Sequence, residues 1–323
     1  MGKARALVDP TMTETVRVAV PRKGRPLEAV FERFADVAGV DDLADDVSST
    51  LRYEKAITKG KTDPERDVYE RLAAYSDLTD PTQPEYTVLR DDREGKPRRI
   101  VFDSVTVHVD DAEPRSADGR PATDGVTVEL IGREEPFRAL RTHEFGLGFD
   151  SADLVLEEVV TLGGTGVESI ADVNARIDPR ETDVRVVSGL GDTVYHTLLA
   201  TPEILPPGAD LDRSFVADYQ GPLCISPRYE RLVRAVLGTN VLDDVEFVYP
   251  DPAAEEEAAI ADAGLGVYLT MTGSTAREHG LVVGDDLFPS ETVVMENVAE
   301  SGTAAERLQT ALTGAGLETA IRP

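Results

Sequence analysis

The chain has one cysteine, no tryptophan and few cations among its 323 residues. Because Cys224 has no second cysteine to pair with, a scaffold of internal disulfides is excluded. No apolar run approaches the ~20 residues of a membrane-spanning helix, and the first residues lack the apolar segment of a secretory signal. We therefore expect a soluble, cytoplasmic protein in which Cys224 is a small buried side chain.

Cations are the scarcest of the common side chains. Lys and Arg number 33 against 61 Asp and Glu, which gives a net charge of −28. A surface this acidic repels nucleic acids and anionic membranes, so we expect neither as a partner. The acidic residues are spread along the whole chain, which is typical of proteins from a high-salt cytoplasm, where salt screens their repulsion. We interpret the acidity as halophilic adaptation and not as a functional site.

Strands and helices alternate along most of the chain. Residues 16–20 form an alternating, valine-rich strand, and residues 26–38 carry the apolar stripe of a helix that Gly39 ends. The same rhythm runs from a strand at 126–131 to a last helix that begins near Thr303. It predicts two α/β domains with mainly parallel sheets. In such folds ligands bind in a cleft at the carboxyl ends of the strands.

Residues 41–125 interrupt this rhythm. Here we predict a helix with Asp63 as its amino-terminal cap, followed by two strands on either side of a turn at 92–97. A polar connection rich in proline and glycine follows at 110–125. Nothing in the sequence indicates a role for this region.

The most specific candidate site is TMTGSTAREHGL at 270–281. Thr272, Gly273, Ser274 and Thr275 lie between a predicted strand and a predicted helix. Hydroxyl groups, backbone N–H groups and a glycine at the start of a helix are what a phosphate group requires. The same residues also suit an ordinary capped turn, so the motif alone supports two interpretations.

A second candidate is PRKGR at 21–25, directly after the first strand. Arg22, Lys23 and Arg25 surround Gly24, in a chain otherwise poor in cations. A solvated loop is the usual meaning of such a charge run. Its position after a core strand nevertheless favours anion binding here.

A third candidate follows the strand near 147–151. Gly146 and Gly148 permit a ligand to approach the backbone, and Asp153 lies just beyond them. Asp153 is expected to cap the next helix or to face the cleft, and capping is the favoured interpretation. The four histidines lack metal-ligand spacing, so no zinc site is expected.

These three segments, in this order, resemble ATP phosphoribosyltransferase, the first enzyme of histidine biosynthesis. VRVAVPRKGRPLE at 16–28 is similar to that family's opening strand and Lys-Gly turn. Residues 130–158 are similar to its middle segment, with an arginine-containing strand, a helix and a Leu-Gly strand. MTGSTAREHGL at 271–281 resembles its phosphoribosyl-diphosphate loop and carries the most specific part of the likeness.

The resemblance implies a fold of the type-2 periplasmic-binding-protein kind with a ligand cleft between the domains. It implies a tail at 1–14, a first domain at 15–182 and 287–323 that includes the extended region 41–125, and a second domain at 183–286. It also implies a reaction in which N1 of ATP displaces pyrophosphate from phosphoribosyl diphosphate, with Mg²⁺ as cofactor. A homo-oligomer is compatible with this assignment.

The resemblance also implies roles for individual residues. The 5-phosphate would be held by Thr272, Gly273, Ser274 and Thr275. The charge of the diphosphate or triphosphate would be met by Lys23, Arg25 and Arg133, with Gly24 and Asp153 in the same substrate-binding set.

The sequence departs from the family at acidic positions that hold the ribose and the metal. Aligned without gaps, these positions are Gly264 and Tyr268. Each lost charge-assisted hydrogen bond costs roughly 1.5–3 kcal/mol. We therefore keep a second hypothesis, a homologue that binds a phosphorylated metabolite or regulates without turnover. A carboxylate from Glu255–Glu257 or Asp153 at the ribose favours the enzyme, whereas Tyr268 filling that space favours the second hypothesis.

Overall fold

The computed structural model describes residues 14–75, 85–92, 99–109, 125–162, 169–238, 245–251 and 255–313. The predicted turn at 92–97 and the polar connection at 110–125 therefore lie almost entirely outside the described residues, as does the tail. No helix in these described ranges is long and apolar enough to cross a membrane.

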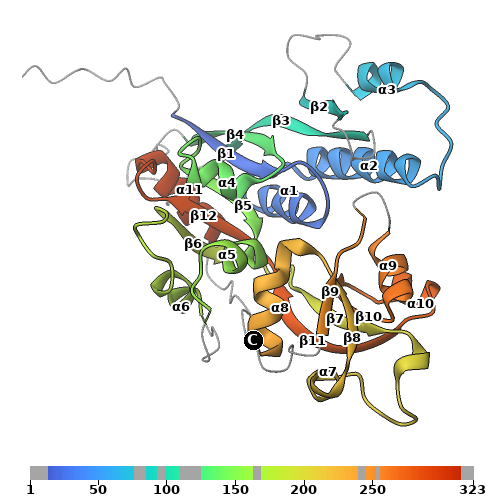
Figure 1. Ribbon diagram of the computed structural model, residues 1–323. Helices are drawn as coiled ribbons and strands as arrows, with labels where there is room; N and C mark the ends of the chain where they lie inside the picture. The colour runs from blue at the N-terminus through green and yellow to red at the C-terminus, as the bar shows by residue number, and fades with distance from the viewer. Residues whose placement is uncertain are drawn as a thin grey trace, which may run out of the picture.

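A seven-stranded sheet forms the first domain, with strand order β2-β3-β4-β1-β5-β12-β6 (Figure 1). Only the pairs β4-β1 and β1-β5 are parallel, and the other four are antiparallel. The strands are β1 (Thr15–Pro21), β2 (Tyr86–Asp91), β3 (Arg99–Val109), β4 (Val126–Arg133), β5 (Leu147–Ser151), β6 (Val184–Gly189) and β12 (Thr292–Asn297).

A five-stranded sheet forms the second domain, with strand order β11-β7-β10-β8-β9. Here β10-β8 and β8-β9 are parallel and the other two pairs are antiparallel. The two predicted α/β domains are confirmed, but both sheets are mixed and not mainly parallel, because hairpin partners and returning strands join each parallel core. The strands are β7 (Val194–Ala200), β8 (Gly221–Ile225), β9 (Val245–Val248), β10 (Leu265–Thr270) and β11 (Val282–Ser290).

Helices cover the faces of both sheets. In Figure 1, α8 lies on the side of the second sheet toward α5, and α9 and α10 lie on the other side. The α-helices are α1 (Arg25–Ala38), α2 (Asp41–Thr58), α3 (Val68–Tyr75), α4 (Pro136–Arg141), α5 (Ala152–Glu158), α6 (Ile170–Ala175), α7 (Arg213–Asp218), α8 (Glu230–Leu237), α9 (Glu256–Ala263), α10 (Ser274–Glu278) and α11 (Thr303–Thr313), and the 3-10 turns are η1 (Pro202–Ile204) and η2 (Pro227–Tyr229).

Helix α1 forms as its sequence predicts. Val30 and Phe34 are buried on its apolar stripe, and a proline occupies its first turn. Gly39 ends the helix in the left-handed conformation at φ 64°, and its N–H donates to the carbonyl of Ala35 at 2.8 Å. The buried stripe packs in one core with the apolar residues of α2, α11 and the first sheet.

The region 41–125 differs from the prediction. Helix α3 begins at Val68 and not beside Asp63, because the Asp67 carboxylate accepts from the N–H groups of Tyr69 (2.8 Å) and Glu70 (3.0 Å). Asp67 and not Asp63 is therefore the amino-terminal cap of α3. Helix α2 was not predicted, since polar Thr50 and Glu54 continue its buried face and obscure the apolar stripe.

Two strands of the second sheet were also not predicted. β8 begins with Gly-Pro, and β11 contains a glycine, two aspartates and a proline, all of which weaken a strand pattern. Both are stabilised by their neighbours in the sheet. Cys224, on β8, is 2 % exposed, and its burial confirms the expectation of a small core side chain.

The chain crosses between the sheets twice. It leaves the first sheet after Gly189 and enters the second at Val194, and it returns between Ser290 and Thr292. The domain boundaries at 183 and 287 stay a prediction. Sheet membership places β6 in the first domain and all of β11 in the second.

One apolar core continues across both domains. It contains Phe137 and Val155 of the first domain together with Leu198, Leu223 and Leu265 of the second. Because apolar burial is the main favourable contribution to folding, the two domains pack as one unit on this side.

A reciprocal pair of caps joins α5 to α8 beside this core. The Arg231 guanidinium donates to the carbonyls of Leu156 (2.6 Å), Glu157 (2.6 Å) and Val160 (2.8 Å) at the end of α5. In return, the Glu157 carboxylate accepts from the N–H groups of Arg231 (3.0 Å) and Leu232 (2.7 Å) at the start of α8. Each helix thus satisfies terminal backbone groups of the other.

We expect Arg231→Ala to lower the free energy of unfolding by about 1–3 kcal/mol, because several carbonyls lose a charged donor. Urea unfolding in molar KCl measures this change. Arg138→Ala removes an exposed arginine paired only with its neighbour Glu135 and should cost no more than about 0.5 kcal/mol. If both variants lost the same unfolding free energy, the caps would contribute no more to stability than an exposed ion pair.

Candidate functional site

The predicted phosphate loop connects β10 to α10. Gly273 is buried and has φ 67°, and an added Cβ would lie 2.9 Å from Val283 Cγ2. Only glycine fits this backbone without strain. The side chains of Thr272 and Ser274 are exposed on either side of it.

Contacts within the loop also stabilise its conformation. Thr272 Oγ1 lies 3.1 Å from Ser274 Oγ, and the Arg277 guanidinium donates to the Thr272 carbonyl at 2.5 Å. The first N–H groups of α10 have no acceptor within the helix, as at any helix start. The Ser274 N–H donates to Thr272 Oγ1 at 3.4 Å. Hydroxyls, the first amides of α10 and a nearby arginine thus surround Gly273, in an arrangement compatible with both interpretations of the motif.

Carboxylates from α9 approach this loop and its preceding strand. The Tyr268 hydroxyl donates to Glu256 Oε2 at 3.3 Å, and burial raises the pKa of Tyr268. Glu255 lies 3.4 Å from His279, which follows α10, and 3.7 Å from Lys59, which follows α2. Tyr268 and a carboxylate therefore occupy the same neighbourhood, beside the strand that leads into the loop.

Lys23 and Gly24 lie at the end of β1, as expected. The Lys23 ammonium is 2.8 Å from Glu134 Oε1, just beyond the parallel strand β4. Gly24 has φ 79°, and its carbonyl accepts from the N–H groups of Leu27 and Glu28, so it caps α1. The charge of Lys23 is thus largely balanced by its neighbour.

Arg25 holds the two crossing segments together. Its guanidinium donates to the carboxylate and carbonyl (2.7 Å) of Asp192 and to Ser290 Oγ at 3.1 Å. Asp192 also accepts from the N–H (2.8 Å) and hydroxyl (2.7 Å) of Thr292. The guanidinium expected at a substrate anion is therefore engaged by protein groups, and sequence reasoning missed Asp192 as its partner.

Glu291 lies beside this contact and is 1 % exposed. Its Oε1 accepts from the Gly191 N–H at 2.8 Å, and its carbonyl accepts from the Ala152 N–H at 2.8 Å. Burial raises the pKa of this carboxyl. The crossing is therefore built from polar groups that have left water, which makes their mutual bonds costly to break.

Arg133 does not join the other predicted anion-binding residues. Its guanidinium lies 4.9 Å from the ring centroid of Phe145 and 3.7 Å from Glu144, and it donates to the Gly132 carbonyl at 3.2 Å. Phe145 precedes the start of β5, so the side chain turns back toward the amino end of that strand.

Asp153 neither caps α5 through the expected bond nor faces an open cleft. It is 1 % exposed, and its Oδ2 lies 2.8 Å from His196 Nε2. The imidazole stacks on Phe288 at 4.3 Å and meets the edge of Tyr229 at 4.5 Å. The pair joins the first domain to the second in the shared core. Sequence reasoning treated the histidines only as metal ligands and missed this role.

Asp150, another buried acid, lies on β5, three residues before Asp153. Its carboxylate accepts from the N–H groups of Phe137 (3.1 Å) and Ser151 (2.9 Å). Burial nevertheless raises its pKa to about 7. The desolvation cost of the charged form thus outweighs the two hydrogen bonds.

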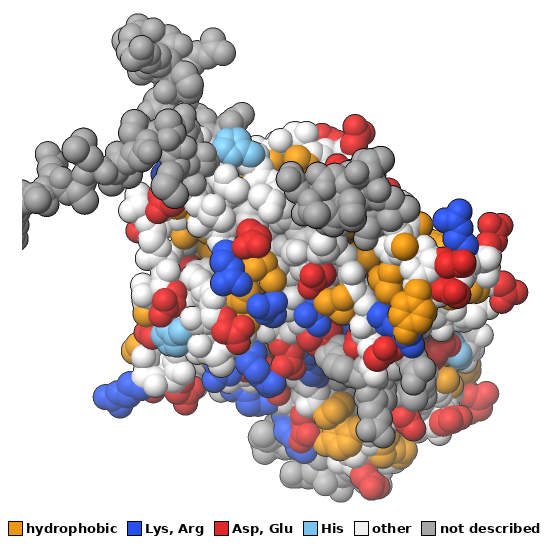
Figure 2. All heavy atoms as spheres, turned by 90° about the horizontal axis from the view of Figure 1, so that it is seen from above, with side chains coloured by type: hydrophobic (Ala, Val, Ile, Leu, Met, Phe, Trp, Pro, Cys, Tyr) orange, Lys and Arg blue, Asp and Glu red, His pale blue; other side chains and the backbone are white. Residues whose placement is uncertain are grey.

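The surface around these sites carries charges of both signs. On the face seen in Figure 2, basic side chains are interspersed with acidic ones. No group of three or more His, Cys, Asp or Glu within the described residues could hold a metal ion by itself.

We expect the stability contributed by Asp150 to fall as the pH rises. The folded protein keeps a proton that the unfolded chain releases above about pH 4, so stability is lost between about pH 4 and pH 7. Asp150→Asn should abolish this part of the slope in urea unfolding measured across that range. Asp218→Asn, at an exposed position, should leave the slope unchanged. A slope identical in all three proteins would contradict the assignment.

The role of Arg25 is tested by a double-mutant cycle with Asp192. Arg25→Ala and Asp192→Ala should each lower the unfolding free energy by about 3 kcal/mol, since each strands a largely buried partner. The double variant should cost about 1–3 kcal/mol less than the sum. If Arg25→Ala instead kept normal stability but bound a diphosphate or triphosphate ligand weakly, the predicted contact between Arg25 and a substrate anion would be supported.

Comparison with known proteins identifies the family. The sequence model for halobacterial ATP phosphoribosyltransferase matches residues 12–323. An ATP phosphoribosyltransferase of Nitrobacter hamburgensis is 29% identical over 134 residues, which are 40% of this chain and 40% of that protein. The match therefore spans less than half the length of this curated relative.

Solved structures share only a distant likeness with this chain. An ATP phosphoribosyl transferase (HisG:HisZ) complex from Thermotoga maritima covers 92% of this chain and 98% of its own, at 13% identity and a TM-score of 0.41. An arginine-bound ArgBP from T. maritima covers 58% and 76%, at 10% identity and a TM-score of 0.35. These scores are too low to support a functional argument. On the strength of the sequence model, which covers nearly the whole length, the chain belongs to the halobacterial ATP phosphoribosyltransferase family.

Proposed function

We propose that this protein transfers the phosphoribosyl group of phosphoribosyl diphosphate to N1 of ATP. Family membership supports the reaction, and the observation that carries it to a site is the loop between β10 and α10. There Gly273 is left-handed and has no room for a side chain beside Val283, between the exposed hydroxyl residues Thr272 and Ser274. Such a loop at a helix start suits a phosphate group.

In this proposal the loop binds the 5-phosphate. Thr272, Ser274 and Thr275 provide hydroxyls, and the first amides of α10 provide N–H donors. Gly273 has no side chain to keep the phosphate from the backbone. Arg277, already bonded to the loop carbonyl, adds positive charge next to this site.

In this proposal the end of β1 and the start of α1 contact the substrates from the side opposite the loop. Figure 1 shows α9 and α10 on the side of the second domain that faces α1 and α2. The 3.7 Å contact between Lys59, which follows α2, and Glu255, which precedes α9, brings the two domains together on this side. Lys23 and Gly24, at the end of β1, then face the diphosphate of phosphoribosyl diphosphate or the triphosphate of ATP. We leave Arg25, Arg133 and Asp153 out of the substrate contacts, because their side chains are already engaged by other residues of this chain.

The displacement requires little covalent help from the protein. Holding the ribose carbon in line with N1 of ATP lowers the barrier through orientation. Mg²⁺ would neutralise the departing diphosphate, and it usually takes one or two protein carboxylates together with substrate phosphates. Glu255 and Glu256, beside His279 and Tyr268, are the carboxylates that we assign to this role.

A second candidate is a homologue that binds phosphoribosyl diphosphate without turnover. Three specific observations favour it: Tyr268 stands where the family has an acid, Lys23 is balanced by Glu134, and Arg25 is engaged by Asp192. In both candidates the loop binds phosphate. We further propose a cytoplasmic, halophilic protein that forms homo-oligomers.

We expect pyrophosphate release from phosphoribosyl diphosphate and ATP, with Mg²⁺ in molar KCl. Thr275→Ala should lower kcat/KM by about 10- to 100-fold, since it removes a hydroxyl bond to a charged group. A coupled pyrophosphate assay measures this rate. Thr310→Ala, on α11, should retain full activity, because its hydroxyl bonds only to the Glu306 carbonyl.

The alternatives give different outcomes in calorimetry. No turnover with tight, Thr275-dependent binding of phosphoribosyl diphosphate would support the binding homologue. No turnover and no binding, in protein shown to be folded at that salt, would reject both candidates.

A further inference from the structure

The extended region between β1 and β4 contains a helix with no apolar anchor. None of the residues of α3 is buried, and an isolated helix of eight residues is unstable in water. The helix is therefore held by its polar contacts. The main one is Glu54 of α2, which is 1 % exposed although α2 lies at the molecular surface.

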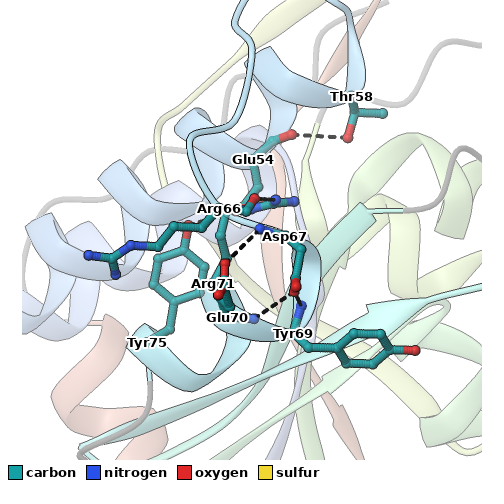
Figure 3. A network of polar contacts seen from close by, with 8 residues as sticks. All are labelled: Glu54, Thr58, Arg66, Asp67, Tyr69, Glu70, Arg71 and Tyr75. Carbon is teal, nitrogen blue, oxygen red and sulfur yellow. Dashed lines mark hydrogen bonds and ion pairs between the residues drawn. The ribbon is translucent and has the colours of Figure 1, made fainter.

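Glu54 binds two side chains of α3 (Figure 3). Arg71 donates to both carboxylate oxygens, at 2.8 and 3.2 Å, and the Tyr75 hydroxyl donates at 2.6 Å. A buried carboxylate requires such partners, and a bidentate guanidinium has a fixed orientation. Arg71 and Tyr75 are thus held in place before any ligand arrives.

A cavity of about 460 Å³ lies between α2, the segment before α3, and α3 itself. This volume is within the range of small-molecule sites. It exists because α2 and α3 meet through the Glu54 contacts and not through packed apolar side chains. The residues used below line it: Tyr53, Glu65, Arg66, Arg71 and Tyr75.

Among the described residues, the cavity contains one cation without an ion-pair partner, Arg66. Arg71 is paired with Glu54, but the side chain of Arg66 forms no ion pair with any residue in the described ranges. In Figure 3 its guanidinium extends away from Glu54, past the ring of Tyr75. In a chain of net charge −28, Arg66 thus lines the same cavity as the aromatic rings of Tyr53 and Tyr75.

We propose that this cavity binds a small aromatic carboxylate, with the carboxylate on Arg66 and the ring against Tyr53 and Tyr75. The guanidinium fork matches a carboxylate through two parallel hydrogen bonds. Tyr53 is 40% exposed and offers an open ring face for offset or edge-on packing. Glu65, next to Arg66 in the chain, repels a second negative charge, so a monoanion is preferred over a phosphate dianion. This site is separate from the phosphate loop and does not depend on the proposed transferase reaction.

Calorimetry or ligand-observed NMR on the full chain in molar KCl tests the proposal, with phenylacetate as the probe. We expect saturable binding with a Kd of ~1 mM or below. Phenyl phosphate should bind about tenfold more weakly because of Glu65, and phenethylamine should not bind. Arg66→Gln should weaken phenylacetate binding by about tenfold or more, and Glu65→Gln should strengthen it.

The matched control is Arg52→Gln on α2, the helix that carries Tyr53. Arg52 is paired with Glu28 and does not line the cavity, so its variant should bind phenylacetate as the wild type does. Urea unfolding of the Arg66 variant should be unchanged, since only its carbonyl accepts a bond from Arg71. The proposal is overturned if phenylacetate does not saturate, if Arg66→Gln and Arg52→Gln have equal effects, or if phenethylamine binds as well.

Discussion

The geometry of this molecule depends on the ion pair between Arg25 and Asp192. The two sheets are joined by only two short crossings, and this pair, together with Thr292 and Ser290, binds both crossings to the start of α1. Since α1 begins directly after the cation-rich turn, the same contact places Lys23 and Gly24 at the edge of the first domain. The cleft that we assign to substrates is bounded by elements whose relative position this pair maintains.

Carboxylates serve two different purposes in this chain. Most are exposed, where they suit a protein adapted to high salt. A few lose contact with water between the domains: buried Asp153 meets His196, buried Glu291 accepts from Gly191, and half-buried Glu157 caps α8. These groups lose hydration on folding and so require the partners that the structure provides. Composition alone makes the two classes indistinguishable, because burial and not residue type separates them.

The backbone of the candidate loop was predictable where it needs a glycine. Gly273 is recognisable because a loop between a strand and a helix needs a residue without a side chain there. The charged residues were less predictable, because a cation in a sequence motif has no visible counter-charge. Arg25 and Asp192 are 167 positions apart, and Arg133 turns toward Phe145 only because β5 lies beside β1. Each of these partners is selected by packing between distant segments.

By itself the sequence determined the family, the two α/β domains and most individual elements, because periodicity, caps and glycine positions act over a few residues. It did not determine the mixed strand order, the strands β8 and β11, or the helix α2, which depend on neighbours distant in the chain. The tertiary structure alone decided which charges are available to a ligand. Electrostatic partners are chosen by proximity in space, and a buried ion pair leaves no periodic signal in the sequence.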